Sequence, residues 1–133
     1  MPLSFHHVGV ACRDLQVEME RLAPLGYVLE GSFFIDETQG VEGAFLVGGG
    51  PRLEILRPLH GQGVLTPWLK TGTKLYHLAY AAGDQLQEEA SALRKQGAKV
   101  VVPPVAATAF GGAEICFLMM PNMLLVELIA VNA

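Results

Sequence analysis

The sequence predicts an α+β fold made of two tandem βαβββ modules. The first observation is that two β-prone runs, Phe5–Val10 and Leu75–Tyr80, share one build, in which a histidine is followed by small residues at every second position. The second observation is that each run leads into a helical pattern and then into three further strand-like segments. A duplication accounts for both observations, and we expect two modules that share one sheet system.

Equivalent residues of the two halves keep a nearly constant spacing along the chain. His7 and His77 are 70 residues apart, and Glu54 and Glu127 are 73 residues apart. A chain of 133 residues has the usual size of one globular domain. We therefore expect a single domain over residues 1–133, with a first module at 1–58, a linker at 59–73 and a second module at 74–133.

In the first module, the strand is followed by Asp14, which is a suitable N-cap for a helix. Apolar residues at spacings of 4, 3 and 3 give this helix one apolar face, and Gly26 is suited to end it. A polar loop at 36–40 and a glycine turn at 48–51 separate the later strands. We expect the helix at Leu15–Leu25 and the strands at Tyr27–Glu30, Val41–Val47 and Arg52–Leu56.

The linker predicts a short helix around Val64–Leu69. In the second module, Asp84 is the expected N-cap of a helix, and Gly97 is expected to end it. Pro103 is expected to stop the strand that follows, because proline lacks the N–H group of a ladder hydrogen bond. The three later strands are expected at Lys99–Val102, Ile115–Met119 and Leu124–Ile129.

Composition and charge exclude several classes of protein. With 51% hydrophobic and 17% charged residues, the chain is too apolar to be disordered. A net charge of −4 without a basic run disfavours nucleic acid and anionic membranes as partners. Cys12 and Cys116 lack a partner spacing, so we expect reduced thiols in a cytoplasmic protein. No secretory signal is recognised, and Pro121 interrupts the most hydrophobic segment, Ile115–Val131, so we expect a soluble protein without a membrane span.

Each half also ends on an apolar strand that carries a lone carboxylate. Glu54 and Glu127 each stand between two apolar neighbours, which strand alternation turns to the opposite face. Burying such a carboxylate alone costs on the order of several kcal/mol, so a bound cation or an arginine must compensate it. His7 and His77 face the side of their strands that carries small residues. Two nitrogens and two oxygens in a shared cleft form a site for a divalent first-row metal ion.

Taken singly, these residues favour simpler interpretations. A lone strand histidine is more often a hydrogen-bonded core or surface residue than a ligand, and a lone strand glutamate more often lies on a solvated edge. The predicted metal site therefore depends on the joint occurrence of an early histidine and a late glutamate in both halves. His6 is the register alternative to His7, and alternation favours His7 because it shares a face with Gly9 and Ala11.

The chain resembles the vicinal oxygen chelate superfamily, which includes glyoxalase I, methylmalonyl-CoA epimerase, extradiol dioxygenases and bleomycin-resistance proteins. The resemblance extends from Phe5 to Ile129. It implies paired βαβββ modules that form a curved mixed sheet around a cleft, and one divalent ion, Ni, Co, Mn, Fe or Zn, with Mg not excluded. The implied ligands are His7 in His-Val-Gly-Val-Ala, Glu54 in Leu-Glu-Ile-Leu, His77 in His-Leu-Ala-Tyr and Glu127 in Val-Glu-Leu-Ile.

Within the superfamily, the sequence looks most like methylmalonyl-CoA epimerases and small glyoxalase-like proteins, in Gln39-Gly40-Val41 and in the segments 53–59 and 68–80. The epimerase pattern commonly has glutamine in place of Glu54 and histidine in place of Tyr76, whereas His-Glu-His-Glu is the ligand set of bacterial-type glyoxalase I. The polar and basic residues expected to hold glutathione are not matched. Some epimerases use a glutamate two residues after Gln-Gly-Val as a base; this chain has Gly43 there, and Glu42 is one position out of phase.

The resemblance implies a metal-dependent isomerase, epimerase or glyoxalase-type lyase that acts on a small molecule with vicinal oxygens. The ion is expected to stabilise an enolate or enediolate, while Glu54 or Glu127 removes and returns a proton next to a carbonyl. A homodimer is also implied. Two alternatives stay open: a small-molecule-binding or resistance protein of the same fold without catalysis, and a ring-cleaving dioxygenase, which needs two histidines and one carboxylate around iron.

Other side chains are weaker candidates for substrate contact. An apolar pocket is one interpretation of several aromatic and Met residues, although such residues more often belong to the core. Arg57 and His60 follow the strand of Glu54 and are suited to an anionic group, although an exposed surface role is the simpler interpretation. The apolar candidates are Phe34, Phe110, Phe117 and Met119, whereas Tyr80 is expected to face away from His77.

Overall fold

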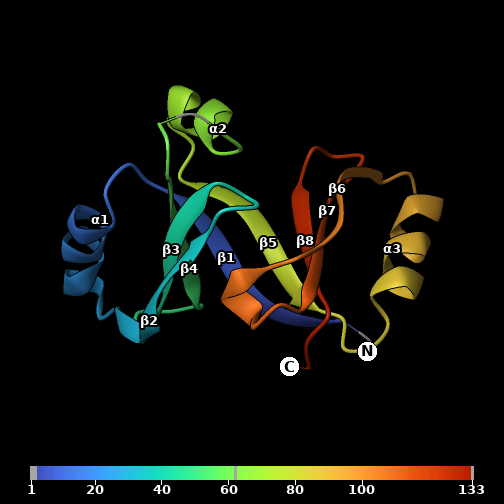
Figure 1. Cartoon of the computed structure of the whole chain (residues 1–133), viewed down its shortest axis with the longest axis horizontal. Coiled ribbons are helices and arrows are strands. Elements are labelled where there is room, and N and C mark those ends of the chain that lie inside the picture. The colour runs from blue at the N-terminus through green and yellow to red at the C-terminus, as the bar shows by residue number, and fades with distance from the viewer. Residues whose placement is uncertain (1–2, 62, 133) are drawn as a thin grey trace. The chain divides into compact units, whose positions relative to one another are not determined.

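The computed structural model describes residues 3–61 and 63–132 and confirms the α+β class and the βαβββ order of both modules (Figure 1). A short helix lies in the linker, and two 3-10 turns, Ala23–Leu25 and Thr108–Phe110, follow α1 and β6. The elements are β1 (Ser4–Ala11), α1 (Leu15–Leu22), β2 (Val28–Asp36), β3 (Val41–Val47), β4 (Leu53–Pro58), α2 (Thr66–Thr71), β5 (Leu75–Ala81), α3 (Leu86–Lys95), β6 (Lys99–Ala106), β7 (Glu114–Met119) and β8 (Leu125–Ile129).

The chain divides into two compact units, which do not coincide with the ends of the two modules. The His7 unit comprises residues 7–76, and the His77 unit comprises residues 3–6 and 77–132 of the described chain. The first residues of β1 therefore belong to the His77 unit, and the first residues of β5 belong to the His7 unit. The single domain expected from the sequence stays a prediction.

The His7 unit is a mixed sheet with the strand order β2-β3-β4-β1. Strands β2, β3 and β4 are antiparallel, and β1 runs parallel to β4. Helix α1 lies along one face of these strands (Figure 1). The core beneath it is formed by buried residues of α1 and of the strands, among them Val10, Leu15, Ala44, Leu46 and Ile55.

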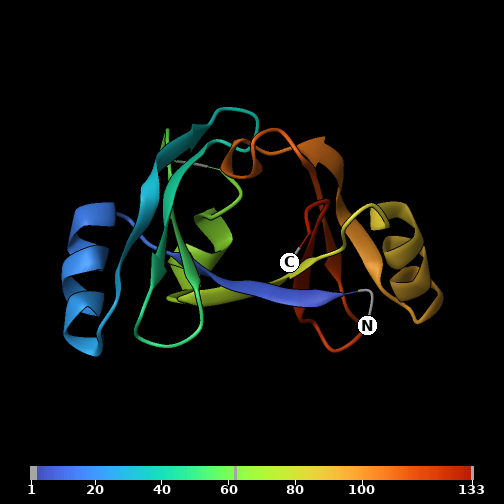
Figure 2. The same ribbon diagram turned by 90° about the horizontal axis from the view of Figure 1, so that it is seen from below.

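The His77 unit repeats this arrangement with the strand order β5-β8-β7-β6. Strand β5 is parallel to β8, and β6, β7 and β8 are antiparallel. Helix α3 (yellow) lies beside the strands of its own unit (Figure 2). Its apolar face covers a core that includes Leu86, Cys116, Leu118, Val126 and Leu128.

The helix ends agree with the sequence prediction at Asp14 and differ from it at Leu25 and Asp84. Asp14 caps α1, since its Oδ1 accepts a hydrogen bond of 3.0 Å from the Val17 N–H. The α-helix ends at Leu22 rather than Leu25, because Pro24 follows and the chain tightens into a 3-10 turn. The predicted cap Asp84 is wrong: Gln85 occupies the N-cap of α3 and no side chain caps it.

The edge strands β2 and β6 are both longer than the sequence predicts. Strand β6 continues through Pro103 to Ala106, and its pairing with β7 shifts register twice along this stretch. Proline is tolerated there because an edge strand has a side that needs no ladder hydrogen bond. Strand β2 continues to Asp36 past a bulge between Glu30 and Phe34. Among the described residues, no helix has the length and apolarity needed to cross a membrane.

Leu46→Ala and Leu118→Ala test whether the two units unfold as one domain. The two leucines are fully buried at equivalent positions, and loss of either side chain should cost roughly 2–5 kcal/mol of the free energy of unfolding. Urea denaturation should show one transition whose midpoint falls in both variants. Leu25→Ala, at an exposed side chain, should change the free energy of unfolding by no more than about 0.5 kcal/mol. Two separate transitions, each shifted by one variant alone, would contradict the single domain.

Candidate metal centre

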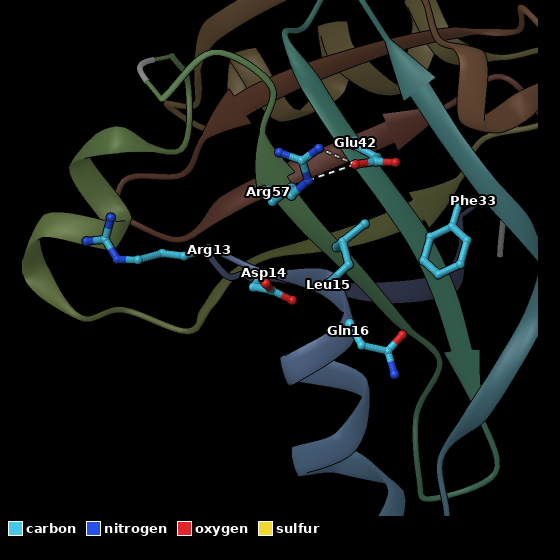
Figure 3. Close-up of a pocket in the computed structure, with 7 residues that line it drawn as sticks. All are labelled: Arg13, Asp14, Leu15, Gln16, Phe33, Glu42 and Arg57. Atoms are coloured by element: carbon cyan, nitrogen blue, oxygen red, sulfur yellow. Dashed lines mark hydrogen bonds and ion pairs between the residues drawn. The ribbon is translucent and has the colours of Figure 1, made fainter.

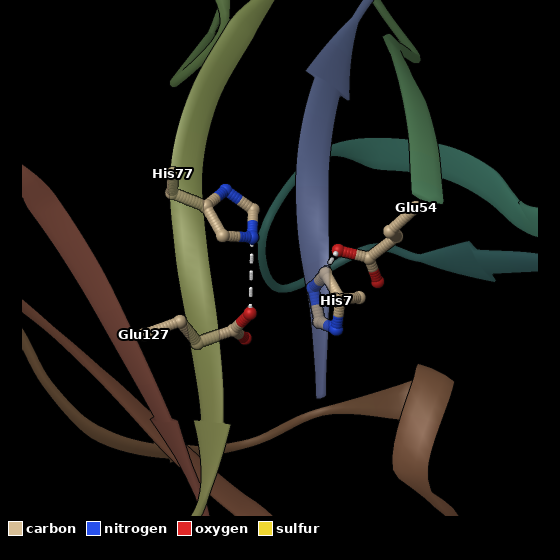
Figure 4. Close-up of side chains that lie close together, drawn as sticks. All are labelled: His7, Glu54, His77 and Glu127. Carbon is tan, nitrogen blue, oxygen red and sulfur yellow. Dashed lines mark ion pairs between the residues drawn. The ribbon is translucent and has the colours of Figure 1, made fainter. Parts of the chain in front are cut away.

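The His7 unit brings a histidine and a glutamate together on neighbouring strands. Glu54 of β4 pairs in register with Gly9 of β1, two residues after His7. The side chains of Val8 and Val10 turn to the helix-covered core, as alternation predicts, so His7 and Glu54 lie on the other face. His7 Nε2 lies 3.1 Å from Glu54 Oε1, and both side chains are buried (Figure 4).

The His77 unit holds the same pair. Glu127 of β8 pairs in register with Ala79 of β5, again two residues after the histidine. His77 Nε2 lies 3.2 Å from Glu127 Oε1, and the two residues are 2% and 3% exposed (Figure 4). A buried carboxylate needs a charged or hydrogen-bonding partner, and the imidazole supplies one in each unit.

The separation within each pair fits two ligands of one first-row metal ion. Ligand atoms at about 2.1 Å from an ion lie about 3.0 Å apart at an octahedral angle and about 3.4 Å apart at a tetrahedral angle. The nitrogen–oxygen distances of 3.1 and 3.2 Å fall between these limits. His7, Glu54, His77 and Glu127 each offer one ligand atom of the types that bind Ni, Co, Mn, Fe or Zn.

An aromatic ring lies against each imidazole; the sequence indicated Phe117 only as a weak candidate for substrate contact and did not indicate Phe45. The ring of Phe45 lies 5.3 Å from that of His7 at an interplanar angle of 73°. The ring of Phe117 lies 5.2 Å from that of His77 at 88°. Phenylalanine in a strand usually indicates core packing, and the one available signal was that both occur in the strand before the glutamate strand.

The side chain of His6, the register alternative, does not take part in the His7–Glu54 pair and belongs to the His77 unit. It is half-buried and its ring contacts Phe110, at 5.5 Å and 82°, within the His77 unit. Of the apolar residues predicted for substrate contact, Phe34 packs against Phe45 at 6.0 Å, and Met119 ends β7 half-buried. These substrate contacts stay predictions.

Arg57 lies in a different pocket from the His7–Glu54 pair. Its Nε donates to Glu42 Oε1 at 2.7 Å, and its Nη1 donates to the Pro58 carbonyl. Arg57 and Glu42 border a pocket of about 380 Å³ beside the start of α1 (Figure 3). The other residues that line it are Arg13, Asp14, Leu15, Gln16 and Phe33. Leu15 belongs to the core under α1, so this pocket opens on the helix side of the sheet.

The structure also resolves the phase of Glu42 and Gly43 on β3. Glu42 forms its ion pair with Arg57 on the helix side. Gly43 turns to the other face, where an added Cβ would lie 2.5 Å from Leu56 Cδ2 and 2.8 Å from Phe34 Cζ. Glu42 therefore does not face the His7–Glu54 pair, and Gly43 leaves no room for a larger residue.

Burial raises the pKa of both cysteines. The pKa of Cys12 rises to about 11, mainly because its thiol is desolvated and secondly because Glu18 is near. The pKa of Cys116 also rises to about 11, by desolvation and then by Glu127. Both are free and buried thiols, and burial with a raised pKa is typical of structural rather than reactive cysteines.

The comparison with known families decides the classification. Residues 6–117 match the model of the Glyoxalase/Bleomycin resistance protein/Dioxygenase superfamily. The chain belongs to this superfamily. The resemblance read from the sequence is thereby confirmed, and members of the superfamily include both enzymes and binding proteins. None of the curated proteins searched matches the chain.

Solved structures of the superfamily's fold cover nearly the whole chain. A hypothetical protein from Bacillus halodurans C-125 is 22% identical, with a TM-score of 0.81 and coverage of 98% of this chain and 96% of that one. Methylmalonyl-CoA epimerase from Mycobacterium tuberculosis is 28% identical (TM-score 0.78, coverage 97% and 88%). A variant of the Streptomyces coelicolor methylmalonyl-CoA epimerase, in complex with 2-nitronate-propionyl-CoA, is 26% identical (TM-score 0.79, coverage 97% of both chains).

The thiols of this superfamily member should react slowly in the native protein. At pH 8, a rise in pKa from 9.0 to about 11 lowers the thiolate fraction roughly 100-fold, and burial slows access further. Labelling with an aromatic disulfide reagent should therefore be at least about 100-fold slower for native than for urea-unfolded protein. Rapid labelling of either cysteine in the native protein would contradict the burial of that thiol.

Proposed function

We propose that this chain is a divalent-metal-dependent enzyme of the glyoxalase or epimerase type. It transfers a proton at a carbon next to a carbonyl of a small molecule with vicinal oxygens. The observation that carries the proposal is the buried His–Glu pair, which occurs in both units at equivalent positions with nearly equal nitrogen–oxygen distances. A single pair is a common structural contact, whereas two copies supply the two nitrogens and two oxygens of one ion site.

The proposal assigns the ligands as His7, Glu54, His77 and Glu127, which share one ion. A divalent ion with such ligands acts as a Lewis acid toward negative charge that develops on substrate oxygens. The histidines would hold such an ion through a ring nitrogen and the glutamates through a carboxylate oxygen, and the apolar strands exclude water from the carboxylates. This low-dielectric environment strengthens the electrostatic interactions on which the chemistry depends.

The same residues supply the base. Glu54 or Glu127 takes the proton from the carbon next to the carbonyl, and the resulting carboxylic acid returns it to the same or the neighbouring carbon. Glu42 is unsuited to this role because it is ion-paired with Arg57 on the helix side of the sheet. Gly43 carries no functional group, so the β3 position that serves as a base in some epimerases has none here.

The similarity to methylmalonyl-CoA epimerases, at 26–28% identity, supports acyl thioesters as the first substrates to test. The ligand set supports hemithioacetals equally, since it is the set found in bacterial-type glyoxalase I. We also propose a homodimer and a cytoplasmic location, which the superfamily supports in general terms. Two alternatives remain, a binding protein without catalysis and an iron dioxygenase. Metal analysis and proton exchange distinguish both from the proposed enzyme.

Metal titration should give one Co²⁺ per chain, bound through both histidines. His7→Ala or His77→Ala should weaken binding more than about 100-fold, because even outer-shell partners of a metal site are worth about 10–100-fold. His60→Ala is the matched control, since the His60 side chain is 75% exposed and its Nε2 lies 3.7 Å from Glu37 Oε2. His6→Ala tests the alternative register and should bind like the wild type.

The stoichiometry separates a shared site from two independent ones. Two ions per chain, each lost in one histidine variant alone, would contradict the shared ion. The absence of any bound divalent ion would favour the binding-protein alternative.

Solvent-deuterium exchange on the metal-loaded protein identifies the base. Against a panel of 2-oxo acids, hemithioacetals and acyl thioesters, the wild type should exchange the proton next to the carbonyl of its substrate. Glu127→Gln or Glu54→Gln should lower this exchange by at least about 100-fold for the base, with metal still bound. Glu42→Gln, on the helix side, should exchange at the wild-type rate. Full exchange in both Glu54→Gln and Glu127→Gln would exclude these carboxylates as the base.

A further inference from the structure

The contact between an aromatic ring and a histidine is duplicated with its geometry intact. In the His7 unit, the rings of Phe45 and His7 are 5.3 Å apart at 73°, and in the His77 unit those of Phe117 and His77 are 5.2 Å apart at 88°. Both are edge-to-face arrangements, the geometry that aromatic quadrupoles prefer. The same type of contact therefore recurs at equivalent positions of the two units.

The strand register explains why each phenylalanine meets its histidine. Phe45 of β3 pairs directly with Glu54 of β4, and Phe117 of β7 pairs directly with Glu127 of β8. Directly paired residues project from the same face of an antiparallel ladder. Each unit therefore presents phenylalanine, glutamate and histidine from three neighbouring strands on one face.

The ring in the His7 unit has a support of its own. Phe34 of the edge strand β2 packs against Phe45 at 6.0 Å. Phe34 reaches this place because Gly43 has no side chain, since a Cβ there would lie 2.8 Å from Phe34 Cζ. In the His77 unit the corresponding residue of β7 is Ile115, which is fully buried, and Phe117 itself is 8% exposed. The two units thus hold equivalent rings by different neighbours.

We propose that Phe45 and Phe117 are positioning residues that orient the two imidazoles for metal binding. A perpendicular ring restricts rotation of the imidazole and keeps its Nε2 directed at the glutamate oxygen. The phenyl ring also offers the carboxylate no competing hydrogen-bond donor. Loss of either ring leaves the ligands present but less ordered, so the site binds its ion more weakly. This inference rests on the proposed function, because it assigns the imidazoles to a metal ion.

Phe45→Leu and Phe117→Leu test the proposal, because leucine keeps the position apolar while removing the ring. We expect each variant to bind Co²⁺ about 10-fold more weakly than the wild type, the lower end of the effect of outer-shell partners. The visible absorption spectrum of bound Co²⁺ should also change in intensity or wavelength, which altered stability alone would not cause. Phe45→Tyr keeps an aromatic ring at this half-buried position, so this variant should retain the wild-type Co²⁺ affinity and spectrum.

Phe33→Leu is the matched control. Phe33 precedes Phe34 on β2 but lines the pocket on the helix side and is 44% exposed. It should bind Co²⁺ with the wild-type affinity and spectrum. Circular dichroism before titration identifies variants that do not fold, and Phe45→Leu decides the question if the more buried Phe117→Leu is unfolded.

The outcomes separate this inference from the proposed function. If the wild type binds Co²⁺ and both folded leucine variants bind it with unchanged affinity and spectrum, the positioning role is wrong while the metal site stands. Equal weakening in Phe33→Leu would also overturn the positioning role, since Phe33 lines the pocket on the helix side of the sheet. If the wild type binds no Co²⁺, the proposed function fails and this inference fails with it.

Discussion

A carboxylate buried in an apolar strand dominates the organisation of each unit. Such a group costs on the order of several kcal/mol to remove from water unless another group compensates it. The neighbouring parallel strand supplies that group as an imidazole, at 3.1 Å in one unit and 3.2 Å in the other. The small residues Gly9 and Ala79 stand beside the carboxylates in the register, so nothing bulky separates acid from imidazole. The residues of these strands that face the helix-covered cores are largely apolar, because alternation turns the histidines and glutamates to the opposite face.

The two units reach the same arrangement with different supporting residues, which indicates which features the arrangement requires. Histidine, glutamate and phenylalanine recur at matching register positions, whereas Gly43 is replaced by Ile115 and the filling side chain Phe34 has no aromatic counterpart in the register of β6. The outer strands differ as well, since β2 has a glycine-containing bulge and β6 contains two prolines. The residues that differ between the two units fill space beside the site, whereas the residues that recur surround the carboxylate.

The sequence predicted the parts of the structure that depend on alternation and repetition. The histidine and glutamate pairs could be found because both occur twice at nearly the same spacing, and because strand alternation places each on the face opposite the core. The extent of β6 was missed because proline was treated as a strand terminator, a rule that does not hold at a sheet edge. The partner of Arg57 and the contact of Phe45 with His7 were missed for another reason. Both depend on which residues face each other across two strands, and that register is set by tertiary pairing rather than by local sequence.

The exchange of strand ends between the units has a consequence for synthesis of the chain. Leu3 packs against the core of the His77 unit, Phe5 contacts Tyr80 and His6 contacts Phe110, so residues 3–6 have their partners far along the chain. As the chain leaves the ribosome, the start of β1 lacks these partners until Tyr80 and Phe110 have emerged. Cleavage at the linker would likewise give two incomplete fragments, one with an unmatched leading strand and one lacking it. The two halves share one pattern of elements, but a division at the linker does not coincide with the boundaries of the two compact units.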